Sequence, residues 1–378
     1  MEIEREIMSV NLDAMRKATT GIAERPAAPK MAATRTPAVK IWAFMGAVWL
    51  LFSLYIWGKW FLAPEFGPTP RGSDPVPQWL FVWTHTFEVL STGMWCACIY
   101  FWAIKPWRKT GRMSWDGLFI LAGATLYIQD PWINYSNYWF LYSSVFINFG
   151  SWTTQLPGWM VPHGNLIPEA PLAWGGAYTW LVIAPAIFAG KAIDAIRRKW
   201  PLTKTLTLVA VFFLCFAFLD LVLEGSFART SLYAFASTMP STTLFAGKPY
   251  QFPMYETIFM GSMWSTYTFF RYFRDDKGRS FVERGADRLG LSEGGTTFVR
   301  WLALVGAVQA ILFLAYNLPV QFTSMHGGVF PKYPSYLVNG VCGPDTPYDC
   351  PGDLTPIPRL TNPTNRVIGN PKSISRRQ

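Results

Sequence analysis

Long apolar segments separated by short polar ones dominate the hydrophobic pattern of this chain. A membrane-spanning helix needs about 20 predominantly apolar residues. Seven segments meet that requirement, at residues 39–62, 79–104, 115–137, 172–195, 204–224, 254–273 and 297–318. The pattern therefore predicts an all-α fold, a polytopic transmembrane helix bundle of about seven spans within residues 39–320. The flanking segments, 1–38 and 321–378, are predicted to be tails.

The third segment is less regular than the others. Its apolar and aromatic character continues to Phe149, which is too far for one simple crossing, and Asp130-Pro131 interrupts it. Because proline removes a backbone donor and breaks or kinks a helix, we expect 132–149 to be a kinked continuation or an interfacial helix. Its aromatic residues suit the level of the lipid headgroups: Trp132, Tyr135, Tyr138, Trp139 and Tyr142.

Composition agrees with a multi-pass protein whose surroundings are the lipid bilayer. Aromatic residues make up 17% of the chain and charged residues only 15%, whereas about a quarter of a soluble domain is charged. The first 35 residues lack the apolar core of a signal peptide. We expect a cytoplasmic tail there, helical at 3–17 and disordered at 24–37.

The distribution of basic residues predicts the orientation. Loops 105–114, 191–204 and 271–296 carry fifteen lysines and arginines, whereas 63–78, 150–171 and 225–253 carry three. Because cytoplasmic loops are enriched in Lys and Arg, we expect a cell-membrane protein with its N-terminus inside and its C-terminus outside. The net charge of +10 lies in these short loops, so we do not expect a nucleic-acid partner.

The cysteines fit this orientation. Cys342 and Cys350 lie in the C-terminal tail, where a disulfide is chemically allowed outside the cell; two unpaired thiols are the alternative. Cys96, Cys98 and Cys215 lie within spans and are predicted to be packing residues. The Cys-Ala-Cys spacing puts two sulfurs on different helical faces, so we predict no metal site.

Acidic residues in the apolar spans point to function. A charge in a bilayer is expensive, and such residues usually face a cavity or a partner. Five carboxylates occur inside or at the mouths of spans: Glu88, Asp130, Asp220, Glu224 and Glu256. At 1.5 Å of rise per residue, Asp130 lies about 22 Å into its span, and the predicted orientation puts all five in the outer half.

Depth and helical face select the candidate residues. His85 and Glu88 are three residues apart, and Asp220 and Glu224 are four apart, so each pair shares a face. We predict an outer acid/base site with catalytic Glu88, Asp130, Asp220 and His85. Substrate contacts are expected from seven residues around it: Trp132, Asn134, Tyr135, Trp139, His163, Glu224 and Glu256.

Structural roles are the alternatives for several of these residues. Glu224 and Glu256 could be solvated at the interface, and Asp220 could cap its helix or pair with Arg229. Asp130 could form a local turn before proline. His85 could be a buried imidazole bonded to Glu88.

Gathered carboxyl groups suit acid/base chemistry. Burial and like charge keep some carboxyls neutral beside ionised ones, which gives an acid and a base at neutral pH. Aromatic faces nearby could stabilise a developing cation, and we expect them from seven residues: Trp83, Tyr127, Trp132, Tyr135, Trp139, Trp264 and Tyr267. No GxSxG, HExxH or phosphate-binding glycine loop is present.

The loop at 150–171 is the other unusual segment. It has no Lys or Arg, but it contains two tryptophans and three prolines after Gly158. We expect a fixed lid over the outer mouth, with His163 and Glu169 above the carboxylates. An inert interfacial loop is the alternative.

The chain resembles the AveC-like spirocyclase family over about 40–360. The resemblance is carried by Asp-Pro-Trp-Ile-Asn-Tyr (130–135), Asn-Tyr-Trp-Phe (137–140), the segment 146–152 and Pro-Gly-Trp-Met-Val-Pro-His-Gly-Asn (157–165). It implies closure of a dihydroxy ketone into a spiroketal, or dehydration, without a cofactor. The expected substrate is an apolar small molecule such as a polyketide, a lipid or an isoprenoid-like compound.

Other functions fit the same acids. A proton-coupled transporter of an apolar substrate predicts pH-dependent flux without a change in the substrate. A non-catalytic membrane scaffold predicts carboxylates spread over different outward faces. A sterol or isoprenoid cyclase or isomerase would use the same acid/base site.

The sequence yields one direct test of the site. If Asp130 and Glu88 form the acid/base pair, Asp130→Asn and Glu88→Gln should each lower turnover, because each removes an ionisable group. The measurement is product formation from a confirmed substrate. Unchanged turnover in both variants would place the site elsewhere.

Overall fold

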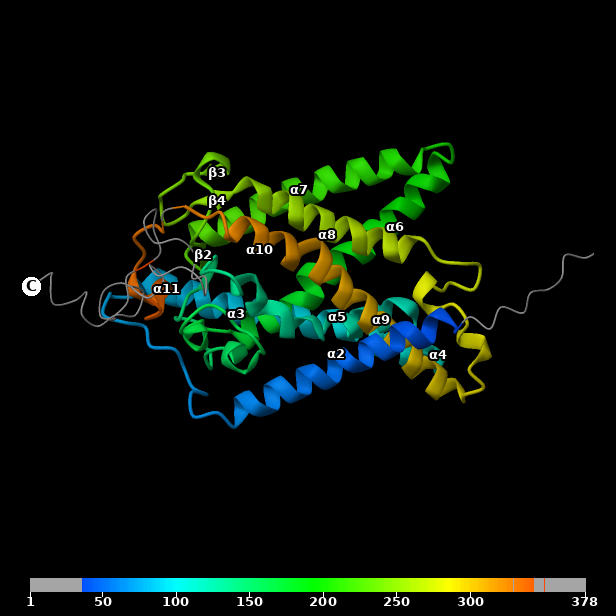
Figure 1. Ribbon diagram of the computed structural model, residues 1–378. Helices are drawn as coiled ribbons and strands as arrows, with labels where there is room; N and C mark the ends of the chain where they lie inside the picture. The colour runs from blue at the N-terminus through cyan, green and yellow to red at the C-terminus, as the bar shows by residue number, and fades with distance from the viewer. Residues whose placement is uncertain (1–35, 329, 343–349, 351–378) are drawn as a thin grey trace, which may run out of the picture. The chain divides into compact units, whose positions relative to one another are not determined.

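Long helices form at most of the predicted spans (Figure 1). The computed structural model describes residues 36–328, 330–342 and 350. The predicted N-terminal helix, most of the predicted disordered stretch and most of the C-terminal tail lie outside these residues. Within them, five helices are long and apolar enough to cross a membrane: Ala38–Phe61, Gln78–Thr110, Pro171–Lys199, Thr205–Arg229 and Glu293–Ser324.

Three of these five helices are composite. Gln78–Thr110 joins α3 (Gln78–Cys98), the π-helical η1 (Ile99–Ile104) and α4 (Lys105–Thr110). Pro171–Lys199 joins π-helical turns η5 (Pro171–Gly175) and η6 (Tyr178–Ile183) to α6 (Ala184–Lys199). Glu293–Ser324 joins α9 (Glu293–Leu312), the π-helical η10 (Phe313–Asn317) and α10 (Leu318–Ser324). The first and fourth helices are α2 (Ala38–Phe61) and α7 (Thr205–Arg229).

The other two predicted spans take different forms. The sixth is α8 (Met254–Tyr272), a 19-residue helix. The third is a short helix, α5 (Trp115–Gly123), followed by the 3-10 helix η2 (Leu126–Asn134), which contains Pro131. Seven membrane crossings and the orientation of the termini therefore remain predictions.

The helix expected within 132–149 is not formed beyond η2. The Asn134 side chain accepts hydrogen bonds from the backbone N–H groups of Trp139 and Phe140, at 3.0 and 2.7 Å, and so closes a turn. Strand β1 (Phe140–Tyr142) follows and pairs antiparallel with β2 (Tyr233–Phe235), with Leu141 opposite Ala234. Tyr138, Trp139 and Tyr142 are consequently buried in protein, and their expected placement among lipid headgroups is wrong.

The two ends of the bundle differ in character. One end holds the α4 helix, the α6–α7 connection and the α8–α9 connection (Figure 1). These segments are rich in lysine and arginine. Two 3-10 turns, η8 (Phe281–Glu283) and η9 (Ala286–Arg288), belong to the α8–α9 connection. The opposite end holds β1 and β2, the short β3–β4 pair (Thr243–Leu244 and Phe252–Pro253) and α11 (Ser335–Val338).

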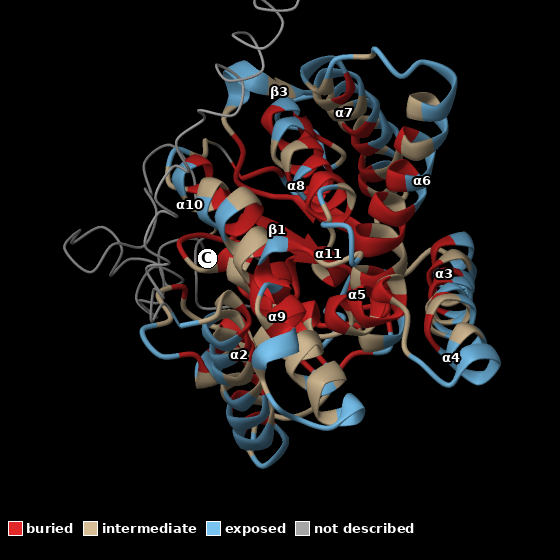
Figure 2. Ribbon diagram, turned by 90° about the vertical axis from the view of Figure 1, so that its right-hand side faces the viewer, coloured by how far each residue is buried: buried red, intermediate tan, exposed pale blue. Residues whose placement is uncertain are grey.

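Burial separates a packed interior from an apolar outer surface (Figure 2). Buried residues are concentrated in α5, α8, α9 and β1. Large exposed hydrophobic residues occur along α2, α3 and α7, among them Phe44, Leu51, Val89 and Leu214. Exposed apolar faces of this extent are expected on helices that contact lipid.

An ion pair holds the basic end together. Arg271, at the end of α8, donates from Nε and Nη2 to the two carboxylate oxygens of Asp116 on α5, at 2.8 and 2.9 Å. The arginine is only 4% exposed, and its planar fork matches the carboxylate geometry. The pair therefore joins two helices where their chains leave the bundle.

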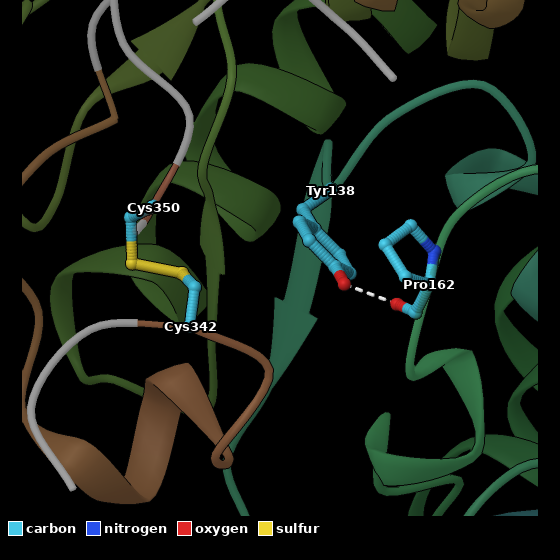
Figure 3. Close-up of a disulfide and its surroundings, with 4 residues drawn as sticks. All are labelled: Tyr138, Pro162, Cys342 and Cys350. Carbon is cyan, nitrogen blue, oxygen red and sulfur yellow. Dashed lines mark hydrogen bonds between the residues drawn. A yellow bond between two sulfur atoms is a disulfide. The ribbon is translucent and has the colours of Figure 1, made fainter. Parts of the chain in front are cut away.

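The segment after α10 packs against the bundle and is not a free tail up to residue 342. Phe330, Tyr333 and Leu337 are buried with Leu141 and Tyr138 from the β1 region. Cys342 and Cys350 form the predicted disulfide (Figure 3). The Tyr138 hydroxyl, shown beside it, donates to the carbonyl of Pro162.

Close contact between α2 and α9 depends on two glycines. A methyl group added to Gly46 would overlap the carbonyl oxygen of Leu302 and would lie 2.9 Å from the backbone nitrogen of Gly306. A methyl group on Gly306 would overlap the carbonyl oxygen of Trp42. Small residues at such crossings let two backbones approach each other in a membrane.

We therefore expect Gly46→Ala to lower stability by about 1–3 kcal/mol, since overpacking forces the helices apart. Gly58→Ala is the matched control on the same helix, because no atom lies within 4 Å of its added methyl group. Thermal unfolding in detergent should show a lower midpoint for Gly46→Ala only. Equal midpoints for the two variants would contradict close packing at this crossing.

Candidate active site

A cavity of about 70 Å³ lies in the interior of the bundle. Its polar lining consists of acids and phenols: Asp130, Tyr142, Tyr178, Glu224, Tyr233 and Tyr316. The remaining lining is apolar and includes Phe140, Trp174, Phe227, Met260 and Met263. None of the residues lining this cavity carries a positive charge.

Asp130 presents its carboxylate to this cavity from η2. Its Oδ1 accepts hydrogen bonds from the hydroxyls of Tyr142 on β1 (2.9 Å) and Tyr178 on η6 (2.8 Å). Its carboxyl group also interacts with that of Glu169, in the loop before η5. Asp130 thus accepts hydrogen bonds from two separate parts of the chain and is more than a local turn former.

Glu169 is the proton-holding partner in this pair. The residue is fully buried, and its Oε1 accepts a hydrogen bond from the Ser151 hydroxyl at 3.3 Å. Burial raises the pKa of the Glu169 carboxyl well above its ordinary value, and the neighbouring Asp130 charge raises that pKa further. A protonated Glu169 can donate to Asp130, which makes a carboxyl–carboxylate pair.

A ladder of buried amides fixes η2 and therefore Asp130. Gln129 Nε2 donates to Gln309 Oε1 on α9 at 2.5 Å, and Asn317 Nδ2 donates to Gln129 Oε1 at 2.8 Å. Gln309 in turn donates to the carbonyl of Thr125 at 2.8 Å. These bonds supply partners for backbone and side-chain groups that a 3-10 segment inside the bundle leaves without hydrogen bonds.

The second group of acids joins α7 and α8. Asp220 and Glu224 interact electrostatically with each other and with Glu256. Tyr316 of η10 donates its hydroxyl proton to Glu256 Oε1 at 2.5 Å. Both oxygens of Asp220 and one oxygen each of Glu224 and Glu256 are buried without a hydrogen-bond donor among the described residues. Like carboxyls gathered in this way can be kept only if they share protons.

The alternatives weighed for these three acids are wrong. Glu224 is 8% exposed and Glu256 is 0% exposed, so neither is solvated at an interface. Glu224 is not at the end of its helix, because α7 continues five residues beyond it, to Arg229. Arg229 lies over the ring of Tyr250, 3.8 Å from its centroid, and the described ion pairs include none between it and Asp220.

His85 and Glu88 form the predicted pair, but away from the cavity. His85 Nδ1 lies 2.6 Å from Glu88 Oε2, and the other oxygen of Glu88 accepts a hydrogen bond from the Ile147 backbone N–H at 2.7 Å. Neither residue belongs to the cavity lining. Glu88 therefore ties α3 to the segment after β1, and the structure does not bring it together with Asp130.

The residues between 132 and 139 that were predicted to contact substrate instead contact neighbouring parts of the protein. Tyr135 donates its hydroxyl to the Gly158 carbonyl at 2.9 Å, and Trp132 packs against Trp49 of α2. Trp139 Nε1 reaches the Tyr255 hydroxyl at 3.4 Å. Together with Asn134, these residues shape the turn that carries Tyr142, but they do not line the cavity.

The loop at 150–171 packs against η2, and its role as a lid stays a prediction. Trp152, in the turn η3 (Trp152–Gln155), donates to the Ile128 carbonyl at 3.0 Å. His163 precedes the turn η4 (Gly164–Leu166) with a left-handed φ of 56°, and partial burial lowers the pKa of its imidazole. Glu169 reaches the acids and His163 is not among the lining residues, so the lid contributes one of its two predicted polar groups.

Sequence reasoning missed the phenols that surround the acids. Tyr142, Tyr178, Tyr233 and Tyr316 line the cavity, whereas none of the seven aromatic residues expected to stabilise a cation does so. A signal was available in part: Tyr178 and Tyr316 are hydroxyl-bearing residues within predicted spans. A buried tyrosine hydroxyl usually requires a partner.

Comparison with known proteins gives one match. The family described as "Spirocyclase AveC-like" matches residues 110–335. This range is narrower than the 40–360 expected from the resemblance; it contains Asp130, Glu169 and the three acids of α7 and α8, but not Glu88. No curated protein and no solved structure matches the chain.

The Asp130–Glu169 pair predicts a pH-dependent stability. The pKa of Glu169 is raised from its ordinary 4.5, so its stabilising contribution is complete below that pH and is lost as pH rises toward the folded value. Gln at position 169 can donate to Asp130 at every pH. We expect the melting temperature of the wild type, relative to Glu169→Gln, to fall as the pH rises above about 5.

The control for this melting series is Glu293→Gln, because Glu293 is exposed and forms only a surface ion pair with Arg112. Its melting temperature should follow the wild type across the pH range. A constant difference between wild type and Glu169→Gln would contradict a protonated Glu169.

Proposed function

The chain belongs to the AveC-like spirocyclase family, and on that premise we propose that it is a membrane-embedded, cofactor-independent acid/base cyclase or dehydratase. Family membership indicates this type of reaction. The observation that supports the proposed site is that Asp130 and Glu224 reach one cavity from different elements. Each interacts with further buried carboxyl groups: Asp130 with Glu169, and Glu224 with Asp220 and Glu256.

The hydrogen-bond pattern supports different roles for the two acids. Asp130 accepts hydrogen bonds from two phenols and interacts with Glu169, which suits a carboxylate that stabilises a cation and accepts a proton. Glu224 has an oxygen without a donor and lies beside two other acids. It suits a neutral carboxyl group that protonates a leaving hydroxyl.

Spiroketal closure would then proceed in two steps. Glu224 gives its proton to the hydroxyl of a hemiketal carbon, the C–O bond breaks, and water leaves with the bonding electron pair. The resulting oxocarbenium ion lies near the Asp130 carboxylate and the rings of Trp174 and Phe140. A second substrate hydroxyl forms the new C–O bond and gives its proton to Asp130. Dehydration differs only in that Asp130 takes a proton from the adjacent carbon.

The lining favours a neutral, largely apolar substrate. A cavity with acids and phenols but without a cation cannot neutralise a phosphate or carboxylate of the substrate. A volume of about 70 Å³ holds only a few water-sized molecules, so a polyketide or isoprenoid-like substrate must displace side chains. Met260 and Met263 are unbranched, adaptable residues at that wall.

This proposal replaces Glu88 by Glu224 as the partner of Asp130. It also bears on the competing functions. A scaffold would have its carboxylates on separate outward faces, whereas Asp130 and Glu224 share a cavity. A transporter would use the same acids without changing the substrate, so product analysis distinguishes it from an enzyme.

The test uses the full chain in lipid nanodiscs with a long-chain dihydroxy ketone as the probe. Asp130→Asn and Glu224→Gln should each lower the rate of protein-dependent spiroketal formation by about 10²–10⁴-fold, since each removes a proton-transfer group. Chiral chromatography with mass detection separates the stereodefined product from the mixture that forms spontaneously.

Two further variants make the result specific. Glu293→Gln, a carboxyl-to-amide change at the exposed start of α9, should keep the wild-type rate. Glu88→Gln should lose less activity than Glu224→Gln if the cavity is the site. Wild-type rates in both Asp130→Asn and Glu224→Gln would refute the proposal. Flux of unchanged probe across the bilayer of proteoliposomes that contain the protein would support transport.

A further inference from the structure

Two tyrosines connect the two groups of acids along the cavity wall. Tyr178 donates to Asp130 at 2.8 Å, and Tyr316 donates to Glu256 at 2.5 Å. Both side chains line the same cavity. Tyr316 also interacts with Glu224. The wall of one cavity thus carries both phenols, one hydrogen-bonded to Asp130 and the other to the acids beside Glu224.

The backbone at these two tyrosines is unusual. Tyr178 begins the π-helical turn η6, and Tyr316 lies in the π-helical turn η10. π-helical turns are rare insertions within α-helices and are frequent at functional sites. Here each turn directs a phenol toward the acids from a separate membrane-length helix.

An acid and a base on different elements create a chemical requirement. After one reaction Glu224 has lost its proton to the departing water, and Asp130 has gained one from the attacking hydroxyl. The next reaction needs the reverse arrangement. All the carboxyls concerned are buried, so the proton must cross the protein interior between them.

We propose that Tyr178 and Tyr316 return the proton from Asp130 to Glu224 after each turnover. This inference rests on the proposed function. The Asp130 proton passes to the Tyr178 oxygen as the Tyr178 proton crosses the cavity that both phenols line and reaches Tyr316. The Tyr316 proton passes to Glu256, and the Glu256 group hands a proton to Glu224. Every intermediate oxygen gains one proton and loses one, no electron is transferred, and no further reactant is needed.

Tyr316→Phe separates the first turnover from the later ones. Tyr316 bonds to Glu256 and not to Asp130, so the first product should form within about threefold of the wild-type rate. Later turnovers should be at least about tenfold slower, because the return path has lost a proton carrier. Rapid-quench measurement with excess dihydroxy ketone should show a burst of one product per protein.

The matched control is Tyr267→Phe on α8. Tyr267 is fully buried and its hydroxyl donates to the Val308 carbonyl at 2.8 Å, but it is not part of the cavity lining. This variant should show no burst. Tyr178→Phe supplies a second measurement: it also removes a donor to Asp130 and should slow both phases, with later turnovers affected more.

The outcomes are distinguishable. Equal slowing of first and later turnovers in Tyr316→Phe would mean that the phenol only positions Glu256, and it would overturn the relay. Wild-type behaviour in Tyr316→Phe and in Tyr178→Phe would also overturn it, in favour of return through water. A wild-type first turnover in Glu224→Gln would instead overturn the proposed function itself.

Discussion

The cost of removing carboxyl groups from water governs the interior of this protein. Asp130, Glu169, Asp220, Glu224 and Glu256 are all buried, and an isolated ionised carboxylate in an apolar interior is several kcal/mol less favourable than in water. None of the six described ion pairs involves one of these five acids. Their compensation comes from phenol donors and from neighbouring carboxyls that hold protons, and both require the acids to be gathered.

Irregular backbone is a consequence of that gathering. η2, β1 and β2 are neither long helices nor exposed loops, and their residues are almost all buried. Non-helical backbone at membrane depth is tolerated only where protein covers it. The amide ladder of Gln129, Gln309 and Asn317 and the turn closed by Asn134 supply that cover with hydrogen bonds. The same segments deliver Asp130 and Tyr142 to the cavity.

Sequence periodicity was sufficient where local composition decides the structure. Apolar length predicted the five membrane-length helices, but the α-helix of the third segment ends at Gly123, before the Asp130-Pro131 interruption, and a 3-10 helix continues through Pro131. Sequence periodicity was insufficient between residues 132 and 149, because the strand there forms only by pairing with residues 233–235, about 90 positions later. Aromatic residues in such a segment look interfacial by composition, whereas their burial depends on long-range packing.

The same distinction explains the choice between Glu88 and Glu224. Depth along a helix can be counted from the sequence, and Glu88 is the more deeply placed of the two within its predicted span. The direction in which each side chain points from its helix matters more for the site. Glu88 turns to His85 and to the backbone of Ile147, while Glu224 turns to the cavity because α8 packs on that face of α7. An acid whose two oxygens both have partners is stable but chemically occupied; one with an oxygen that lacks a donor retains the capacity to move a proton.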